Sequence, residues 1–180
     1  PKGDVLIDIE TLGTKRNAVI VSIGAVIFNR ADEPGTIIDS AHFKLDIENQ
    51  GNRDLCPSTL KWWLSEGMKD ALDLAFRYPK KEQVRLGLAL KKLEDFIKEH
   101  DVNVCWGCGP NFDMEILQDA YEQHGVPFPV PFWKWSCVRT IEEFFYGENT
   151  RKEGKPNYIE GVAHDALHDC LMEALVIQKC

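Results

Sequence analysis

Two acidic residues interrupt an apolar segment near the start of the sequence. In DVLIDIETLGT, residues 4–14, Asp8 and Glu10 lie among Val, Leu and Ile residues that are expected to be buried. Alternate residues of a β-strand point to the same face, so these two carboxylates would lie side by side and repel each other without a cation between them. The pair is therefore either a surface feature at a frayed strand end or a site for a divalent cation.

Acids and histidines recur together later in the sequence. Asp113 follows the segment GCGPNF and opens an expected helix, where the helix dipole favours an acid in any case. The segment HDALHD, residues 164–169, contains two histidines and two acids, which would also suit a solvated helix face. His164 and Asp169 are five residues apart, so they converge only if His164 precedes the helix, where Gly161 would allow a bend.

The hydrophobic pattern changes along the chain from strands to helices. Apolar and β-branched segments predict strands at residues 4–9, 18–28, 37–47, 102–107 and 132–137. Apolar stripes and helix start signals predict helices at residues 57–66, 81–99, 112–124, 138–146 and from 162 onward. The polar, glycine-containing segment 147–161 is expected to be an exposed loop.

This order of elements predicts an α/β protein with a mixed five-stranded sheet. Three consecutive strands with short connections indicate antiparallel pairing, and two later strands reached through helices indicate parallel pairing. Helices then cover both faces of the sheet, which is the layout of the ribonuclease H-like fold. No repeat or linker divides the sequence, so residues 1–180 are expected to form a single domain.

Composition argues against several classes of protein. The formal net charge of −8 disfavours binding to nucleic acid through bulk basicity, although bound metal ions would reverse the local field. No apolar run is long enough to span a bilayer and no signal peptide is visible, so a cytoplasmic protein is expected. Cys105 and Cys108 form a lone C-x-x-C without the second pair of a zinc site, and reduced thiols are expected.

The acidic clusters would converge if the fourth strand pairs beside the first and the C-terminal helix crosses the same edge of the sheet. The acids concerned are Asp8, Glu10, Asp113 and Asp169. Without Lys or Arg between them, such a cluster is tolerable only with bound cations, and oxygen ligands select Mg²⁺ or Mn²⁺ over Zn²⁺. Two such ions suit displacement at phosphorus, and a nearby histidine would be the general base.

Three short segments resemble the motifs of the DEDDh 3'→5' exonucleases: DIET at 8–11, NFD at 111–113 and HDALHD at 164–169. The resemblance covers nearly the whole sequence. The segments STLKWWLSE, WGCGPNFDMEIL, FWKWSCVRT and VAHDALHD are further similar to the phage and prophage branch typified by phage exonuclease A. The resemblance implies two divalent cations, Mg²⁺ or Mn²⁺, and release of nucleoside 5'-monophosphates from the 3' ends of single-stranded DNA or RNA. It also suggests a homodimer.

The same resemblance implies roles for individual residues. The matches to the metal-binding acids are Asp8, Glu10, Asp113 and Asp169. His164 matches the general base, because the family places four residues between this histidine and the last acid, and His168 and Asp165 are then bystanders. The substrate-binding positions are Thr11, Leu12, Asn111 and Phe112. Many relatives carry an Asn at the position of Cys108, so this departure argues against a polar contact from that loop.

Aromatic and basic residues add candidate substrate contacts. Trp62 and Trp63 are adjacent on an expected helix, so at most one of them is expected to be fully buried. An exposed Trp would suit base stacking, and the alternative is a core or interface residue. Arg139 either contacts a backbone phosphate or pairs with an acid. The alternatives to an exonuclease are a non-catalytic nucleic-acid or protein-interaction module on this fold and a ribonuclease H-type endonuclease, which needs no such histidine.

Overall fold

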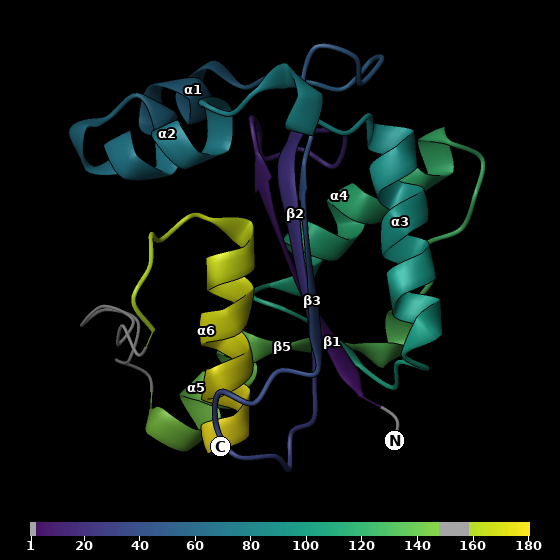
Figure 1. The fold of residues 1–180 in the computed structure, drawn as a ribbon, viewed down its shortest axis with the longest axis vertical. Coiled ribbons are helices and arrows are strands. Elements are labelled where there is room, and N and C mark those ends of the chain that lie inside the picture. Colours follow the sequence, from purple (N-terminus) through teal and green to yellow (C-terminus); the bar gives the residue numbers. More distant parts are fainter. Residues whose placement is uncertain (1–2, 148–158) are drawn as a thin grey trace.

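A five-stranded mixed sheet forms the centre of the molecule (Figure 1). The computed structural model describes residues 3–147 and 159–180. The strands are β1 (Asp4–Thr11), β2 (Ile20–Phe28), β3 (Asp39–Lys44), β4 (Cys105–Gly107) and β5 (Trp135–Cys137). Their order in the sheet is β3-β2-β1-β4-β5. β1, β2 and β3 pair antiparallel, whereas β4 pairs parallel to β1 and β5 parallel to β4. The predicted ribonuclease H-like α/β arrangement is therefore confirmed.

Helices cover both faces of this sheet and one of its ends. The α-helices are α1 (Pro57–Trp63), α2 (Lys69–Phe76), α3 (Leu86–Glu99), α4 (Pro110–Gln123), α5 (Val138–Tyr146) and α6 (Ala166–Lys179). α3 and α4 lie on one face, α5 and α6 lie on the other, and α1 and α2 sit at one end of the sheet (Figure 1). Short 3₁₀ turns occur at Glu66–Met68, Lys80–Glu82 and Phe132–Lys134.

The alternation of β1 decides which helices its side chains meet. Val5, Ile7 and Ile9 belong to the core against α3 and α4, whereas Leu6 packs in the core that includes α6. Because side chains of a strand alternate between faces, Asp8 and Glu10 share the face of Leu6. The two acids therefore point to the side of the sheet that α6 covers.

Several boundaries differ from those that the sequence predicts. The helix expected at 57–66 ends at Trp63, and α2 follows it as an additional helix. The C-terminal helix begins at Ala166 rather than 162, because Asp165 accepts a hydrogen bond from His168 N–H and caps it. The loop expected at 147–161 lies mostly outside the described residues. Among the residues that are described, none belongs to a helix long and apolar enough to cross a membrane.

Candidate active site

The C-terminal end of β1 presents the first two acids. Asp8 pairs with Gly24 of β2 and Glu10 with Ser22, after which the register shifts between Glu10 and Thr11. Such an irregularity bends a strand locally and is common beside functional sites. Oδ2 of Asp8 is buried without a hydrogen-bond partner among the described residues. A buried carboxylate oxygen without a donor is costly, and a bound cation would satisfy it.

The turn between β4 and α4 brings Asp113 beside β1. Gly109 has φ +107°, a conformation that favours glycine, and Pro110 follows as the first residue of the helix. Asp113 is in the first helical turn and is buried, and its Oδ1 accepts a long hydrogen bond of 3.4 Å from the Ile9 N–H. Asp113 therefore lies directly against the strand that presents Asp8.

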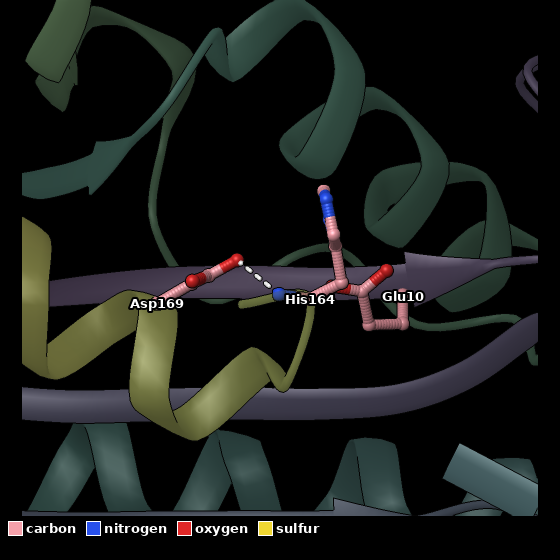
Figure 2. Close-up of side chains that lie close together, drawn as sticks. All are labelled: Glu10, His164 and Asp169. Atoms are coloured by element: carbon pink, nitrogen blue, oxygen red, sulfur yellow. Dashed lines mark hydrogen bonds between the residues drawn. The ribbon is translucent and has the colours of Figure 1, made fainter. Parts of the chain in front are cut away.

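The start of α6 supplies the histidine and the last acid. His164 precedes the helix and has φ +65°, which is unusual for a residue other than glycine. Its backbone N–H donates to Oδ2 of Asp169 at 3.2 Å, as Figure 2 shows. The bend that the sequence requires is therefore present, but it falls on His164. Gly161 has no positive φ, and a Cβ there would lie 2.2 Å from the His168 ring.

A close approach between β2 and α6 lets these groups meet. A Cβ on Gly24 would lie 2.3 Å from the backbone oxygen of Ala166, which is closer than any real contact. Only glycine therefore lets the first turn of α6 lie against the sheet at this point. As a result, ligand atoms of Glu10, His164 and Asp169 lie within 4.8 Å of one another (Figure 2).

These groups open into one cleft of about 1010 Å³. Its lining includes the predicted residues Asp8, Glu10, Thr11, Asn111, Phe112, Asp113, His164 and Asp169. Leu12 is not part of the lining, because its side chain packs with Val19 and Trp63 in the core beneath α1 and α2. The assignment of these residues to catalysis, metal binding or substrate binding stays a prediction.

Burial and mutual repulsion disfavour the charged forms of the acids. The pKa of Asp8 is raised well above its ordinary value, first by burial and then by the charge of Asp113. Burial and the charge of Asp169 raise the pKa of Glu10 in the same way. Burial and the charge of Glu173 raise the pKa of Asp113 to about 7. Positive charge in the cleft would reverse these effects and stabilise the carboxylates.

Glu173 is a buried acid of this cleft that the sequence analysis missed. It lines the cleft, is 1% exposed and lies one helical turn after Asp169 on α6. Its charge contributes to the raised pKa values of Asp8 and Asp113. The spacing of four residues from Asp169 was the available signal, since residues i and i+4 share a helix face.

The structure tests the predictions made for the adjacent tryptophans and for the cysteines. Trp63 is buried and donates to the Thr11 carbonyl oxygen at 3.0 Å, whereas Trp62 is 42% exposed and lines the cleft. One tryptophan of the pair is therefore buried, as expected. The Trp62 ring lies edge-on to the His164 ring with centroids 4.9 Å apart. All six cysteines are free, and Cys105 is buried.

The donor set fits divalent cations of the hard type. The cleft places carboxylate oxygens from three elements together, and one of those oxygens is buried without a hydrogen bond from the described residues. Carboxylate oxygens suit Mg²⁺ and Mn²⁺, whereas a structural zinc site would require several Cys or His ligands. The residues present therefore match a magnesium or manganese site.

Solved structures with the same fold include nucleases. The nuclease domain of 3'hExo, a DEDDh family member bound to rAMP, superposes with a TM-score of 0.66 at 18% identity, covering 99% of this chain and 90% of that one. E. coli exonuclease I in complex with a dT13 oligonucleotide gives a TM-score of 0.69 at 13% identity. That match covers 99% of this chain but 41% of exonuclease I. The chain therefore shares its fold with known nucleases, and its acidic cleft lies within that fold.

The family can be stated more narrowly from the sequence. The profile of the Rv2179c-like family, described as a 3'-5' exoribonuclease Rv2179c-like domain, matches residues 3–180, and the chain belongs to this family. The exodeoxyribonuclease of Enterobacteria phage T4 is 26% identical over 201 residues, which cover 97% of this chain and 87% of the phage protein. The chain is therefore a 3'→5' exonuclease enzyme, and its family implies dependence on divalent metal.

Proposed function

We propose that this exonuclease removes nucleoside 5'-monophosphates from the 3' ends of single-stranded nucleic acid with two divalent cations, Mg²⁺ or Mn²⁺. The observation that supports this best is the convergence of acids from β1, α4 and α6 on one cleft, with a buried Asp8 oxygen that lacks a donor among the described residues. A non-catalytic module on the same fold would have no reason to keep so many destabilising carboxylates together.

The carboxylates of the cleft would hold the metal ions. The residues proposed as ligands are Asp8, Glu10, Asp113 and Asp169. When bound, the cations lower the pKa of water and neutralise charge on the attacked phosphate. The hydrogen bond from the His164 N–H to Asp169 leaves the other carboxylate oxygen of Asp169 available as a ligand. The first turn of α6 thereby orients one ligand while presenting the histidine beside it.

His164 is the proposed general base. A ring nitrogen of His164 lies within 4.8 Å of carboxylate oxygens of Glu10 and Asp169, and the residue lines the cleft. In hydrolysis the ring accepts a proton from the attacking water, a bond forms from water oxygen to phosphorus, and the bond from phosphorus to the preceding 3' oxygen breaks. That oxygen takes a proton from solvent, which leaves a shortened strand with a 3' hydroxyl and a nucleoside 5'-monophosphate.

The substrate end is proposed to lie between the two walls of the cleft. Phe112 is 37% exposed and Trp62 is 42% exposed, and both line the cleft, so both offer ring surface to unpaired bases. Stacking of this kind requires bases that are free of a duplex. Thr11 and Asn111 line the same cleft, which supports their proposed role in binding the terminal nucleotide.

We also propose that residues 1–180 form one domain and that two copies associate as a homodimer. The three apolar cores of the described residues all pack on or beside the same sheet, which supports the single domain. The homodimer follows only from the family resemblance. Sedimentation at several concentrations would test it, and a monomer at all of them would exclude it.

The activity can be tested by digestion of 5'-labelled single-stranded DNA and RNA of the same sequence. With Mg²⁺ or Mn²⁺ we expect stepwise shortening of the strands and release of nucleoside 5'-monophosphates. With EDTA we expect no digestion. Asp8→Asn should remove nearly all of this activity, whereas Glu115→Gln, an exposed acid of α4 with the same charge change, should retain it. Wild-type turnover in Asp8→Asn would refute the proposed site.

Circular single strands separate the exonuclease from the alternatives. An exonuclease leaves circles intact, whereas a ribonuclease H-type endonuclease opens them. A non-catalytic module would cut neither linear nor circular strands, and its melting temperature would not rise with Mn²⁺.

A further inference from the structure

Arg139 is the only Lys or Arg among the described residues that line the cleft. It lies in the first turn of α5, directly after β5, and its side chain reaches toward the turn before α4. A Cβ on Gly109 would be 3.6 Å from Cζ of Arg139 and less than 4 Å from both terminal nitrogens. The guanidinium therefore lies close to the Gly109 backbone, at the edge of the cleft.

No ion pair with another described residue accounts for this position. Among residues 3–147 and 159–180, no carboxylate oxygen lies within 4.0 Å of the Arg139 nitrogens, although the cleft is rich in acids. Its charge does act at longer range, because it lowers the pKa of Asp113 against the larger effect of burial. The sequence-based alternative that Arg139 simply pairs with an acid is thus not realised in the described part of the chain.

Helix stability does not account for Arg139 either. A cation in the first turn of a helix meets the positive end of the helix dipole, which disfavours it. α5 contains no acid in its first turn to offset that effect. An exposed arginine in an unfavourable position beside a nuclease cleft is better explained by a ligand than by the fold.

We propose that Arg139 donates hydrogen bonds to a backbone phosphate of the strand bound in this cleft. The planar guanidinium presents paired donors that match two non-bridging phosphate oxygens, and such charge-assisted bonds are stronger than neutral ones. The chain as a whole has a net charge of −8, so bulk charge cannot attract a polyanion to the cleft. This inference rests on the proposed use of the cleft for nucleic acid.

The test combines a charge-neutral arginine variant with charge-neutral phosphates. Binding of 3'-terminal oligonucleotides would be followed by fluorescence anisotropy in Ca²⁺, with strand integrity checked on gels. Each oligonucleotide carries one methylphosphonate at one of the last five linkages, because a single binding site spans on the order of five nucleotides. The variants are Arg139→Gln and, as matched control, Arg85→Gln. Arg85 is also exposed, also lies at a helix start, and lies outside the cleft.

We expect Arg139→Gln to weaken binding of the unmodified strand by about 10- to 100-fold, the range for charge-assisted hydrogen bonds. One methylphosphonate position should weaken wild type and Arg85→Gln by a similar factor but leave Arg139→Gln unaffected, because contacting groups are not additive. If the effects of Arg139→Gln and the methylphosphonate on affinity were additive at all five positions, the inference would be overturned. Equal affinity of Arg139→Gln and Arg85→Gln would also overturn it. Neither result would contradict the proposed function. Absence of any binding by wild type would overturn the proposed function together with the inference.

Discussion

Replacing Asp113 by Asn should stabilise the protein in the absence of metal. Asp113 is buried beside Glu173, and burial and that charge raise its pKa to about 7 from an ordinary value of 3.8. An amide has no charge to desolvate, and its oxygen can still accept the hydrogen bond from the Ile9 N–H. The substitution therefore removes the electrostatic cost and keeps the local geometry.

The size and sign of this effect follow from linkage. A tenfold change in an ionisation constant is equivalent to about 1.4 kcal/mol, so the raised pKa of Asp113 corresponds to about 4 kcal/mol at most. The folded wild type binds this proton more tightly than the unfolded chain. Its free energy of unfolding therefore falls as pH rises from about 4 to about 7. Above pH 7 the folded wild type has lost all of the stability that depends on this proton. Asp113→Asn has no proton to lose at this position and should not show this decrease.

Urea denaturation in EDTA at pH values from 5 to 9 would measure the difference. We expect the stability advantage of Asp113→Asn to increase with pH and level off near pH 8, and to vanish or reverse when Mn²⁺ is added. Glu115→Gln is the control, because Glu115 is exposed on the same helix and its substitution changes the net charge equally. An advantage that does not depend on pH, or that Glu115→Gln shares, would refute the reasoning.

Three further changes separate catalysis from structure. His164→Gln should lower kcat by about 10²- to 10⁴-fold, the usual range for a general base, with little change in KM. Steady-state kinetics at several pH values would show whether the acidic limb of the pH–rate profile is lost. Gly24→Ala should cost about 1–3 kcal/mol in urea denaturation and weaken Mn²⁺ binding, since its methyl would collide with the Ala166 backbone; unchanged stability would contradict this. Asp165→Ala should lower the free energy of unfolding by about 1 kcal/mol, because the helix loses its cap, but should retain turnover. An inactive variant would instead indicate that Asp165 is a metal ligand.

The sequence predicted the sheet and the acids because both are encoded locally. Alternation and β-branched residues mark the strands, and Asp8 and Glu10 share a face by the period of a strand alone. The short helix α2 was missed because its eight residues follow α1 closely and lack a clear start signal. Its N-cap makes no side-chain hydrogen bond, so no capping residue marks the boundary.

What the sequence left open depends on contacts between distant segments. The close approach of Gly24 to Ala166 involves residues from β2 and α6, and no local pattern connects them. The buried position of Glu173 follows from that approach, because α6 must lie close to the sheet before its inner face is enclosed. The sequence indicated a bend before the helix that Gly161 would allow, but no local pattern showed that His164 itself adopts the positive φ.

The late position of α6 has a consequence for the chain as it is being synthesised. β1 and β2 can pair soon after they leave the ribosome, but His164 and Asp169 come from an element that follows all five strands. Until that segment docks, the growing polypeptide lacks two of the five groups proposed to cut nucleic acid, His164 and Asp169. On the proposed mechanism, the active site would therefore be completed only when the last helix of the chain has been synthesised and has docked on the sheet.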